Sequence, residues 1–403
     1  MINKQMLQFP LIYTSVINRM IIGWGAHETI ADECKANNMK KVLITTTGLR
    51  GTGIVDEIDH ILSTNGVETE IYNKVTTNVK DYQVMEAYEV FKNAGCDGVV
   101  SIGGGSSHDC GKGVRAVAAN DGQYICDMAC FIDPPWIEEK KKYKPVTIPQ
   151  ISVNTTAGTS AESTFVASVI NTRVRAKHNI VLDGITPTLA IVDPLFVRLM
   201  PQYVAAWTGF DALSHGFESF LSRIRSPYTP ALTLQMIKLI SHNLREFVYN
   251  RMNNVACENM CWAANMSAAA LHFGGGPGLV HGLSNHFSAV TDSHHGHTNA
   301  SMTLPIERYN EPACFDRFAE MTKTMGVDTS CMTQIEASDR WFVEMERFLD
   351  DLNMQTGQLS KRFGLKKEDI KHIVEECAND FCQEGNPKDF NFDEAVQLLE
   401  SMM

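Results

Sequence analysis

The first half of the chain alternates short segments rich in β-branched residues with segments of helical periodicity, and this alternation restricts the possible folds more than any other feature. Five segments have the composition of strands: 40–47, 67–75, 99–102, 144–152 and 189–194. Between them, 53–66 and 81–95 have helical periodicity, and each ends in glycine. Parallel strands need a long crossover connection, which is usually a helix. We therefore predict an α/β domain with a parallel, Rossmann-like sheet over residues 1–193.

The second half of the chain has a different character, which begins after Pro201. Helical periodicity dominates as far as the last residue and is interrupted by the glycine-rich segment 273–282 and by single prolines. We predict a second, all-α domain over residues 194–403. A length of 403 residues by itself favours two or three domains.

Charge and composition exclude several classes of function. The formal net charge of −12 argues against a nucleic-acid partner, which selects for clustered lysine and arginine. No apolar run reaches the roughly 18 residues of a membrane span, and the first residues lack the features of a secretory signal. The eleven cysteines are scattered, so we expect reduced thiols in a cytoplasmic protein.

A glycine-rich turn, residues 103–105, directly follows the predicted strand 99–102. Ser106 and Ser107 can cap a helix that begins there, and the free backbone N–H groups of a helix N-terminus attract phosphate. The turn is not the G-x-G-x-x-G fingerprint. Taken alone, it is equally compatible with a phosphate-binding turn and with a plain tight turn.

A second polar loop with a glycine follows the next predicted strand, at 153–164. Its threonine hydroxyls and Gly158 suit a loop that grips a nucleotide, although a simple solvated loop has a similar composition. Two such loops after consecutive strands favour a dinucleotide at the carboxyl edge of a parallel sheet.

Asp211, His215 and Glu218 have helical spacing within the segment FDALSHGFESF. They therefore share one face of a helix among apolar neighbours. Taken alone, the Asp211 and His215 pair is most often a hydrogen-bonded polar pair within a core. The alternative is half of a metal site, which requires two further ligands downstream.

Histidines are concentrated downstream, where six of the thirteen lie within residues 272–297. His281 and His295 are fourteen residues apart, about four turns if the helix were continuous. With Asp211 and His215 they offer three imidazoles and one carboxylate, a set that suits Fe²⁺, Zn²⁺ or Mn²⁺ better than Mg²⁺ or Ca²⁺. A cluster of surface histidines is the alternative.

The chain as a whole resembles the iron-dependent (group III) alcohol dehydrogenases. The motifs GGGSSHD, TTAGTSAE, TGFDALSHGFE, the histidine segment ending in HHG and the late EGNPKD occur in the order and at the spacings of that family. TTGLRGTG, SIGGGSSHD and DSHHG are most similar to the cytoplasmic methanol dehydrogenases and the nicotinoprotein methanol oxidoreductases. The resemblance implies a dinucleotide-binding N-terminal domain, a helical C-terminal domain and an active site in the cleft between them.

The same resemblance implies the site residues. The metal ligands would be Asp211, His215, His281 and His295. The cofactor contacts would be Thr47, Gly103, Gly104, Gly105, Ser106, Asp109, Thr155, Thr156 and Thr159. The cofactor would be NAD(H) or NADP(H), the metal one divalent ion, with iron first and zinc or manganese as alternatives, and the assembly a homo-oligomer, either dimer or decamer.

Three positions depart from the family pattern. Thr47 stands where an aspartate commonly holds the adenosine ribose, which leaves the choice between NAD and NADP open. Asn285 stands where many relatives have a histidine, and His286 is next to it. The family lysine corresponds to His178, with Lys177 adjacent.

We predict a metal-dependent alcohol dehydrogenase or aldehyde reductase for a short primary alcohol or aldehyde of about one to four carbons. His286 or His297 is predicted to relay the proton. Polar residues near His295 predict a pocket wall that favours polar aldehydes, namely Asn285, His286, His294 and His297. Two rivals are a lyase-type relative on the same fold, which would need a denser basic pocket for a phosphorylated substrate, and a non-catalytic assembly protein.

Overall fold

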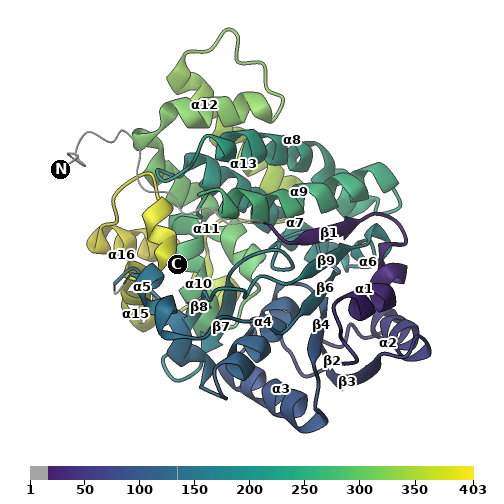
Figure 1. Ribbon diagram of the computed structural model, residues 1–403. Coiled ribbons are helices and arrows are strands. Elements are labelled where there is room, and N and C mark those ends of the chain that lie inside the picture. The colour runs from purple at the N-terminus through teal and green to yellow at the C-terminus, as the bar shows by residue number, and fades with distance from the viewer. Residues whose placement is uncertain (1–16, 134) are drawn as a thin grey trace, which may run out of the picture.

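A six-stranded parallel sheet forms the first half of the structure, a computed structural model that describes residues 17–133 and 135–403 (Figure 1). The strand order is β1, β9, β6, β4, β2, β3. In that order the strands span Arg19–Ile22, Leu189–Val192, Gln150–Asn154, Gly98–Gly103, Lys41–Thr46 and Glu68–Tyr72. All pairings are parallel, so the carboxyl ends of the strands lie at one edge. The predicted α/β class is confirmed.

Helices cover both faces of this sheet. Those on one face are α1 (Ile30–Ala36) and α2 (Ile54–Thr64), and those on the other are α3 (Asp81–Ala94) and α4 (Gly105–Ala119). Side chains alternate along each strand, so Val42 and Ile44 pack toward α1 and α2, whereas Leu43 packs toward α3 and α4. A strand buried on both faces reads as a continuous apolar run, which is the pattern of KVLIT.

Two strand boundaries differ from the predicted ones. Strand β6 begins at Gln150 rather than at residue 144, because prolines at 145 and 149 lack the N–H that a central strand must donate. Strand β9 ends at Val192, because Asp193 caps the short helix α6 (Pro194–Val197) by accepting a hydrogen bond from Leu195 N at 2.9 Å.

A small antiparallel sheet, which the sequence did not predict, stands beside the main one. Its strands, in the order β5, β8, β7, span Ala129–Cys130, Ala176–Ile180 and Ala167–Asn171. Strand β7 packs on α4 and strand β8 on the helical half. The short helix α5 (Trp136–Glu139) follows β5.

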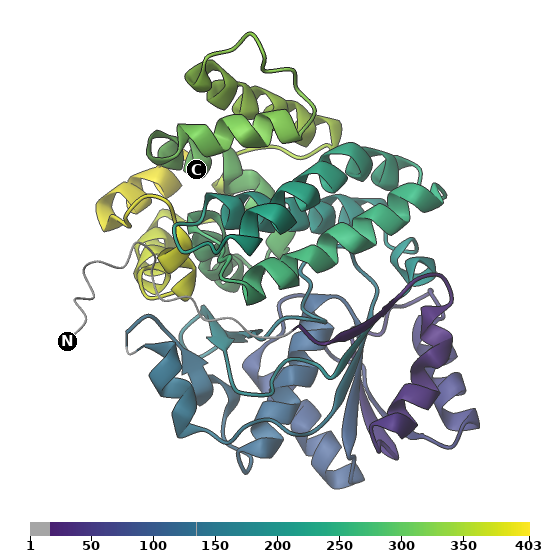
Figure 2. The same cartoon turned by 45° about the horizontal axis from the view of Figure 1, so that its top comes forward.

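The second half of the chain is helical and lies above the sheet in Figure 2. Its helices are α7 (Gln202–Leu221), α8 (Tyr228–Tyr249), α9 (Asn254–His272), α10 (Leu279–Thr291), α11 (His295–Asn310), α12 (Phe315–Thr324), α13 (Gln334–Asp351), α14 (Leu359–Phe363), α15 (Lys367–Ala378) and α16 (Phe392–Ser401). Short 3-10 helices span Ala26–Thr29, Ile125–Met128, Lys140–Lys142, Glu311–Ala313 and Phe381–Gly385. Helix α7 packs against α8, α9 and α11, so it is buried on nearly every side and holds its polar residues in the interior.

Ten of the eleven cysteines are buried and none is paired, while Cys331 is exposed. Across the two described ranges, no helix combines the length and the apolar character that crossing a membrane requires. The initial residues, for which the sequence predicts no secretory signal, lie outside the described part of the chain.

Candidate active site

A cavity of about 310 Å³ lies between the carboxyl edge of the sheet and helices α7 and α11. Its walls come from the loops after β2, β4 and β6, from α7 and from the start of α11. Most of the residues predicted to contact a cofactor line it: Thr47, Gly104, Gly105, Ser106, Asp109, Thr155, Thr156 and Thr159. Gly103 is the last residue of β4 and is not part of the lining. Asp211 and His295 line the same cavity.

Glycines at 104 and 105 allow the loop after β4 to touch the loop after β6. A Cβ on Gly104 would lie 2.8 Å from Thr156 Cγ2, and one on Gly105 would lie 2.9 Å from Thr159 Oγ1. A larger residue at either position would push the two loops apart. Glycine therefore leaves bare backbone N–H groups at the cavity.

Helix α4 begins before Ser106 and Ser107, the residues that the sequence predicts as its caps. Gly104 is the cap residue, and the helix starts at Gly105, so both serines lie in its first turn. Ser107 Oγ is buried without a hydrogen-bond partner, and Ser107 lines the cavity. A free helix N-terminus beside an unpaired hydroxyl fits an anionic group such as a pyrophosphate.

Asp109 lines the cavity one turn further into α4. Its Oδ1 accepts a hydrogen bond from Lys112 Nζ at 3.1 Å, and the fully buried Lys112 also donates to Thr164 Oγ1 at 2.9 Å and to Val166 O at 2.6 Å. Burial raises the pKa of the Asp109 carboxyl, and the adjacent ammonium group opposes that rise. A carboxyl group here repels phosphate but accepts hydrogen bonds from hydroxyl and amide groups.

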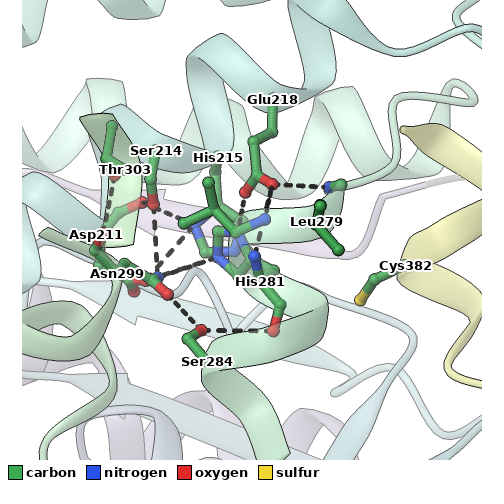
Figure 3. A network of polar contacts seen from close by, with 12 residues as sticks. Asp211, Ser214, His215, Glu218, Leu279, His281, Ser284, Asn299, Thr303 and Cys382 are labelled. Atoms are coloured by element: carbon green, nitrogen blue, oxygen red, sulfur yellow. Dashed lines mark hydrogen bonds and ion pairs between the residues drawn. The ribbon is translucent and has the colours of Figure 1, made fainter. Parts of the chain in front are cut away.

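Asp211, His281 and His295 converge beside the cavity, although they come from three helices. One ligand atom from each lies within 4.8 Å of the other two. Figure 3 shows Asp211 and His281 with their polar neighbours. His281 Nε2 and His295 Nε2 each lie 3.6 Å from Asp211 Oδ1. The segment between the two histidines is not one continuous helix. Helix α10 ends before Asp292, whose left-handed φ of 54° turns the chain into α11.

His215 lies one turn after Asp211 on α7 but is not part of the convergent trio. Its Nδ1 donates a hydrogen bond to the Asp211 backbone oxygen at 2.9 Å, so Nε2 is the nitrogen left with a lone pair. Its ring centroid lies 4.2 Å from that of His281. The structure thus gathers three of the four predicted ligands and sets the fourth next to them.

Most of these groups are held in the protonation states that a metal requires, a carboxylate and neutral imidazoles. Burial opposes the charge on Asp211, but three neighbouring histidines hold its pKa well below the ordinary value. Burial lowers the pKa of His215 to about 4 and that of His295 well below its ordinary value. His281 differs, because Glu218 and Asp211 outweigh its burial and raise its pKa to about 9. A metal would displace a proton from His281.

Asn299, which the sequence did not single out, contacts the same three donor atoms. Its Nδ2 lies 2.8 Å from Asp211 Oδ1 and 3.3 Å from both His281 Nε2 and His295 Nε2. A partly positive amide nitrogen therefore lies where three electron-rich atoms converge. Its position four residues after His295 on one helix face is the signal that could have identified it.

His286 does not line the cavity, so its predicted relay role has no contact there. It follows His281 by five residues on α10, a rotation of about 140° around the helix. Its Nε2 lies 3.3 Å from Asp380 Oδ2, and Asn285 Nδ2 lies 3.4 Å from the same oxygen. Neither residue adds polarity to the cavity wall.

His297 also lies outside the lining. Its ring stacks on Trp207 with centroids 4.6 Å apart, and its Nε2 accepts a hydrogen bond from Arg362 at 2.6 Å. Burial and the nearby guanidinium lower the pKa of His297 to about 4. Because Arg362 occupies the lone pair, this geometry argues against a relay role for His297.

Lys177 and His294 supply polar groups to the cavity. Side chains alternate along β8, so Lys177 lines the cavity, whereas His178 packs edge-on against Phe131 with centroids 5.2 Å apart. The structure thus brings Lys177 to the cavity and not His178, and the correspondence of His178 with the family lysine stays a prediction. Of the four residues predicted to form a polar wall, His294 alone lines the cavity, and its Nδ1 is buried without a hydrogen-bond partner.

Two contacts join the halves of the protein next to the cavity. Asn78 Nδ2 donates to Ser293 O at 2.8 Å, and Lys80 Nζ pairs with Asp292 Oδ1 at 2.7 Å. Residues on both sides of these contacts line the cavity. The loop after β3 is thereby fastened to the turn between α10 and α11.

Comparisons with known proteins agree with this architecture. Residues 18–194 match the family model described as iron-containing alcohol dehydrogenase, and residues 205–403 match that of the Fe-containing alcohol dehydrogenase family, C-terminal. The chain is 36% identical to methanol:N,N-dimethyl-4-nitrosoaniline oxidoreductase of Mycobacterium sp. (strain DSM 3803 / JC1), over 98% of this chain and 97% of the relative. It is 32% identical to NAD-dependent methanol dehydrogenase of Bacillus methanolicus, over 95% and 97%. The solved structure of a 1,3-propanediol oxidoreductase superposes with a TM-score of 0.89 at 30% identity, covering 98% of this chain and 100% of that one.

Proposed function

The chain belongs to the iron-containing alcohol dehydrogenase family and is a metal-dependent, NAD-linked alcohol dehydrogenase, and we propose that it interconverts short primary alcohols and their aldehydes in the cavity described above. The observation that carries the proposal is the convergence of Asp211, His281 and His295 beside the same cavity that the glycine loop lines. A nicotinamide and a Lewis-acidic metal held side by side are what hydride removal from an alcohol requires.

We assign the metal to Asp211, His215, His281 and His295, with Fe²⁺ first and Zn²⁺ or Mn²⁺ as alternatives. Three imidazoles and one carboxylate suit these ions. When bound, the metal supplies a Lewis acid for the alcohol oxygen and the dinucleotide supplies a hydride acceptor. The protein keeps the ligand atoms of Asp211, His281 and His295 within 4.8 Å of one another. It also holds all four residues away from bulk water, because they are buried or nearly so.

We propose that the pyrophosphate binds at the N-terminus of α4. Gly104, Gly105 and Ser106 would present their backbone N–H groups there, and the unpaired Ser107 hydroxyl would donate a further hydrogen bond. Gly103 supports this arrangement, because a Cβ on it would lie 2.4 Å from Ser107 Oγ. The threonines of the second loop would bound the rest of the dinucleotide; they are Thr155, Thr156 and Thr159.

Asp109 and Thr47, two residues of the proposed cofactor site, differ in charge. Asp109 would accept hydrogen bonds from a ribose hydroxyl or from the nicotinamide amide, since its carboxyl repels phosphate. Thr47, at the position where the family resemblance places an adenosine-binding aspartate, lines the same cavity and carries no charge to repel a 2′-phosphate. We therefore propose that NADP(H) is used appreciably beside NAD(H).

We propose a substrate of about one to four carbons that can carry a second polar group. The relatives named above act on methanol and on 1,3-propanediol, both short primary alcohols. His294 brings an unpaired ring nitrogen to the wall near the proposed metal, and Lys177 lines the same wall. A buried polar group left without a partner costs about 1–3 kcal/mol, so a hydroxyl that satisfies one should be preferred to a methyl group.

The test combines metal analysis with substrate kinetics. His281→Ala and His295→Ala should lose metal and activity while keeping their fold, and full metal occupancy in both variants would contradict the ligand assignment. Metal-reconstituted enzyme should be assayed with ethanol, 1-butanol, 1,2-propanediol, 1,3-propanediol and the matching aldehydes. A clear preference for long or branched apolar alcohols would contradict the substrate proposal.

We also propose that the protein is a cytoplasmic homo-oligomer, either a dimer or a decamer. Its unpaired, mostly buried cysteines are compatible with a reducing compartment. Sedimentation analysis of the purified protein tests the assembly, and a monomer at micromolar concentration would refute it.

A further inference from the structure

Glu218 joins helix α7 to the first turn of helix α10. Its side chain is buried, and Oε1 accepts hydrogen bonds from the backbone nitrogens of Gly278 and Val280, both at 2.9 Å. His281 N lies 3.4 Å from the same oxygen. The other carboxylate oxygen, Oε2, is in close hydrogen-bonding contact with Nδ1 of the His281 ring (Figure 3).

This contact determines which nitrogen of His281 faces the proposed metal. A carboxylate only accepts hydrogen bonds, so the nitrogen that touches Glu218 must carry the proton. Nδ1 of His281 is therefore an N–H, and in the neutral ring, the form that binds a metal, the lone pair is on Nε2. Nε2 is the atom that lies 3.6 Å from Asp211 Oδ1. A carboxylate behind a ligating histidine commonly fixes the tautomer in this way.

The same carboxylate sets the position of the helix that carries His281. Free N–H groups and the helix dipole at the start of α10 attract a negative charge. The approach is close, because a Cβ on Gly278 would lie 3.1 Å from Glu218 Oε1 and 3.0 Å from Asn386 Oδ1. Asn386 Oδ1 in turn accepts a hydrogen bond from Leu279 N at 3.1 Å. Helix α10 thus begins at a fixed distance from α7.

We propose that Glu218 is the positioning residue of the metal centre, which sets both the tautomer of His281 and its place relative to Asp211. This inference rests on the ligand set in the proposed function. One residue of α7 thereby links ligands on two helices: Asp211 lies seven positions before Glu218 on its own helix, and His281 lies across from it on α10.

Glu218→Gln keeps the shape of the side chain but removes its charge and replaces one acceptor oxygen by a donor group. Its amide has one acceptor and one donor end. If the NH₂ faces His281, the ring must accept at Nδ1 and carry its proton on Nε2, where the metal would bind. If the oxygen faces His281, the NH₂ points at the N–H groups of Gly278 and Val280, and α10 has to move. Either outcome weakens metal binding.

Glu307 on α11 provides a matched control. It is fully buried, its Oε1 has no hydrogen-bond partner, and its Oε2 accepts from Asn310 Nδ2 at 3.3 Å. Burial, with a contribution from the Glu218 charge, raises the pKa of Glu307 well above its ordinary value. Glutamine keeps the size and shape of this side chain, and no hydrogen bond joins Glu307 to His281.

The experiment measures Zn²⁺ affinity by competition with a chelator, together with the unfolding temperature of the metal-free proteins. Glu218→Gln should bind Zn²⁺ about 10- to 100-fold more weakly than the wild type, whereas Glu307→Gln should stay within about twofold of it. Wild-type affinity in Glu218→Gln would overturn the proposal. Full Zn²⁺ binding by His281→Ala would instead overturn the ligand assignment on which it rests.

A measurement on the wild type keeps the proposal testable if Glu218→Gln does not fold. In Zn²⁺-loaded, ¹⁵N-histidine-labelled protein, the His281 signals, assigned by their loss in His281→Ala, should show a proton on Nδ1 and none on Nε2. A proton on Nε2 would overturn the proposal. Glu218→Asp, which still only accepts hydrogen bonds, should retain the Nδ1 proton, and its loss would contradict the role of the carboxylate.

Discussion

Replacing Gly296 by alanine should displace a proposed metal ligand without touching it. Gly296 is the second residue of α11 and directly follows His295. A Cβ at this position would lie 2.1 Å from the Trp207 backbone oxygen and 3.1 Å from Asp211 Cβ. A carbon and a carbonyl oxygen in contact are normally about 3.3 Å apart, so the start of α11 must move by roughly 1 Å, because neither backbone can rotate away.

The size of the effect follows from this displacement. His295 Nε2, now 3.6 Å from Asp211 Oδ1, would move with the helix. A misplacement of about 1 Å at a reacting centre costs about 10²-fold in rate, and an overpacked core loses about 1–3 kcal/mol of stability. We therefore expect kcat/KM to fall by about two orders of magnitude, with weaker metal binding and a lower unfolding temperature.

The assay measures metal bound per chain at a fixed chelator concentration, kcat/KM for the best alcohol and the unfolding temperature. Gly276→Ala is the matched control, because a Cβ there meets nothing closer than Ile224 Cδ1 at 3.6 Å. The control should behave as the wild type. If Gly296→Ala retained wild-type metal affinity and kcat/KM, the close contact between α7 and α11 would not set the ligand geometry, and the reasoning would be refuted.

Three further predictions concern cofactor choice, pH and metal removal. Thr47→Asp should raise the ratio of kcat/KM for NAD to that for NADP, because a carboxylate repels the 2′-phosphate; an unchanged ratio would exclude Thr47 as the discriminating position. Burial lowers the pKa of His108 to about 3 and that of His178 to about 4, so the stability they contribute is complete above about pH 6.5, the unfolded value, and is lost as the pH falls toward 4. Urea unfolding midpoints measured at several pH values should show this loss. His178→Gln should make the midpoint depend less on pH, whereas a substitution at the exposed His60 should leave that dependence unchanged. Chelation should lower the unfolding temperature, since a ligand at 1,000 times its Kd stabilises the native state by about 4 kcal/mol; an unaltered temperature would mean that the metal does not bridge the helices.

The main sheet could be predicted from the sequence because its strands are buried on both faces and separated by helices that end in glycine. The antiparallel sheet could not, because β7 and β8 mix polar and apolar residues, as in AKHNI, and pair mainly with each other and with two residues of β5. The placement of this sheet decides which of Lys177 and His178 reaches the cavity, and the sequence could not show that it is Lys177.

The candidate ligands could be identified because histidine and aspartate are recognisable as metal ligands from their residue type alone. What the sequence could not show was the direction in which each side chain points. His286 and His297 were selected for being close in sequence to the ligands, but helix rotation turns both away from the cavity. The spacing places Glu218 on the same face of α7 as Asp211 and His215. Its partner His281 lies on another helix about 60 residues later, and local spacing does not predict such a long-range contact.

The place of β1 in the sheet has a consequence for synthesis on the ribosome. β1 pairs in parallel with β9, from Arg19 beside Leu189 to Ile22 beside Val192. It therefore leaves the ribosome about 170 residues before its partner, a delay of roughly 9 to 34 s at about 5–20 residues per second. In the last part of that interval, once residue 154 has emerged, β6 also waits for β9 with an open edge. The nascent chain thus offers unpaired strand edges to its neighbours until residue 192 has emerged, and this is the period in which it depends most on chaperones.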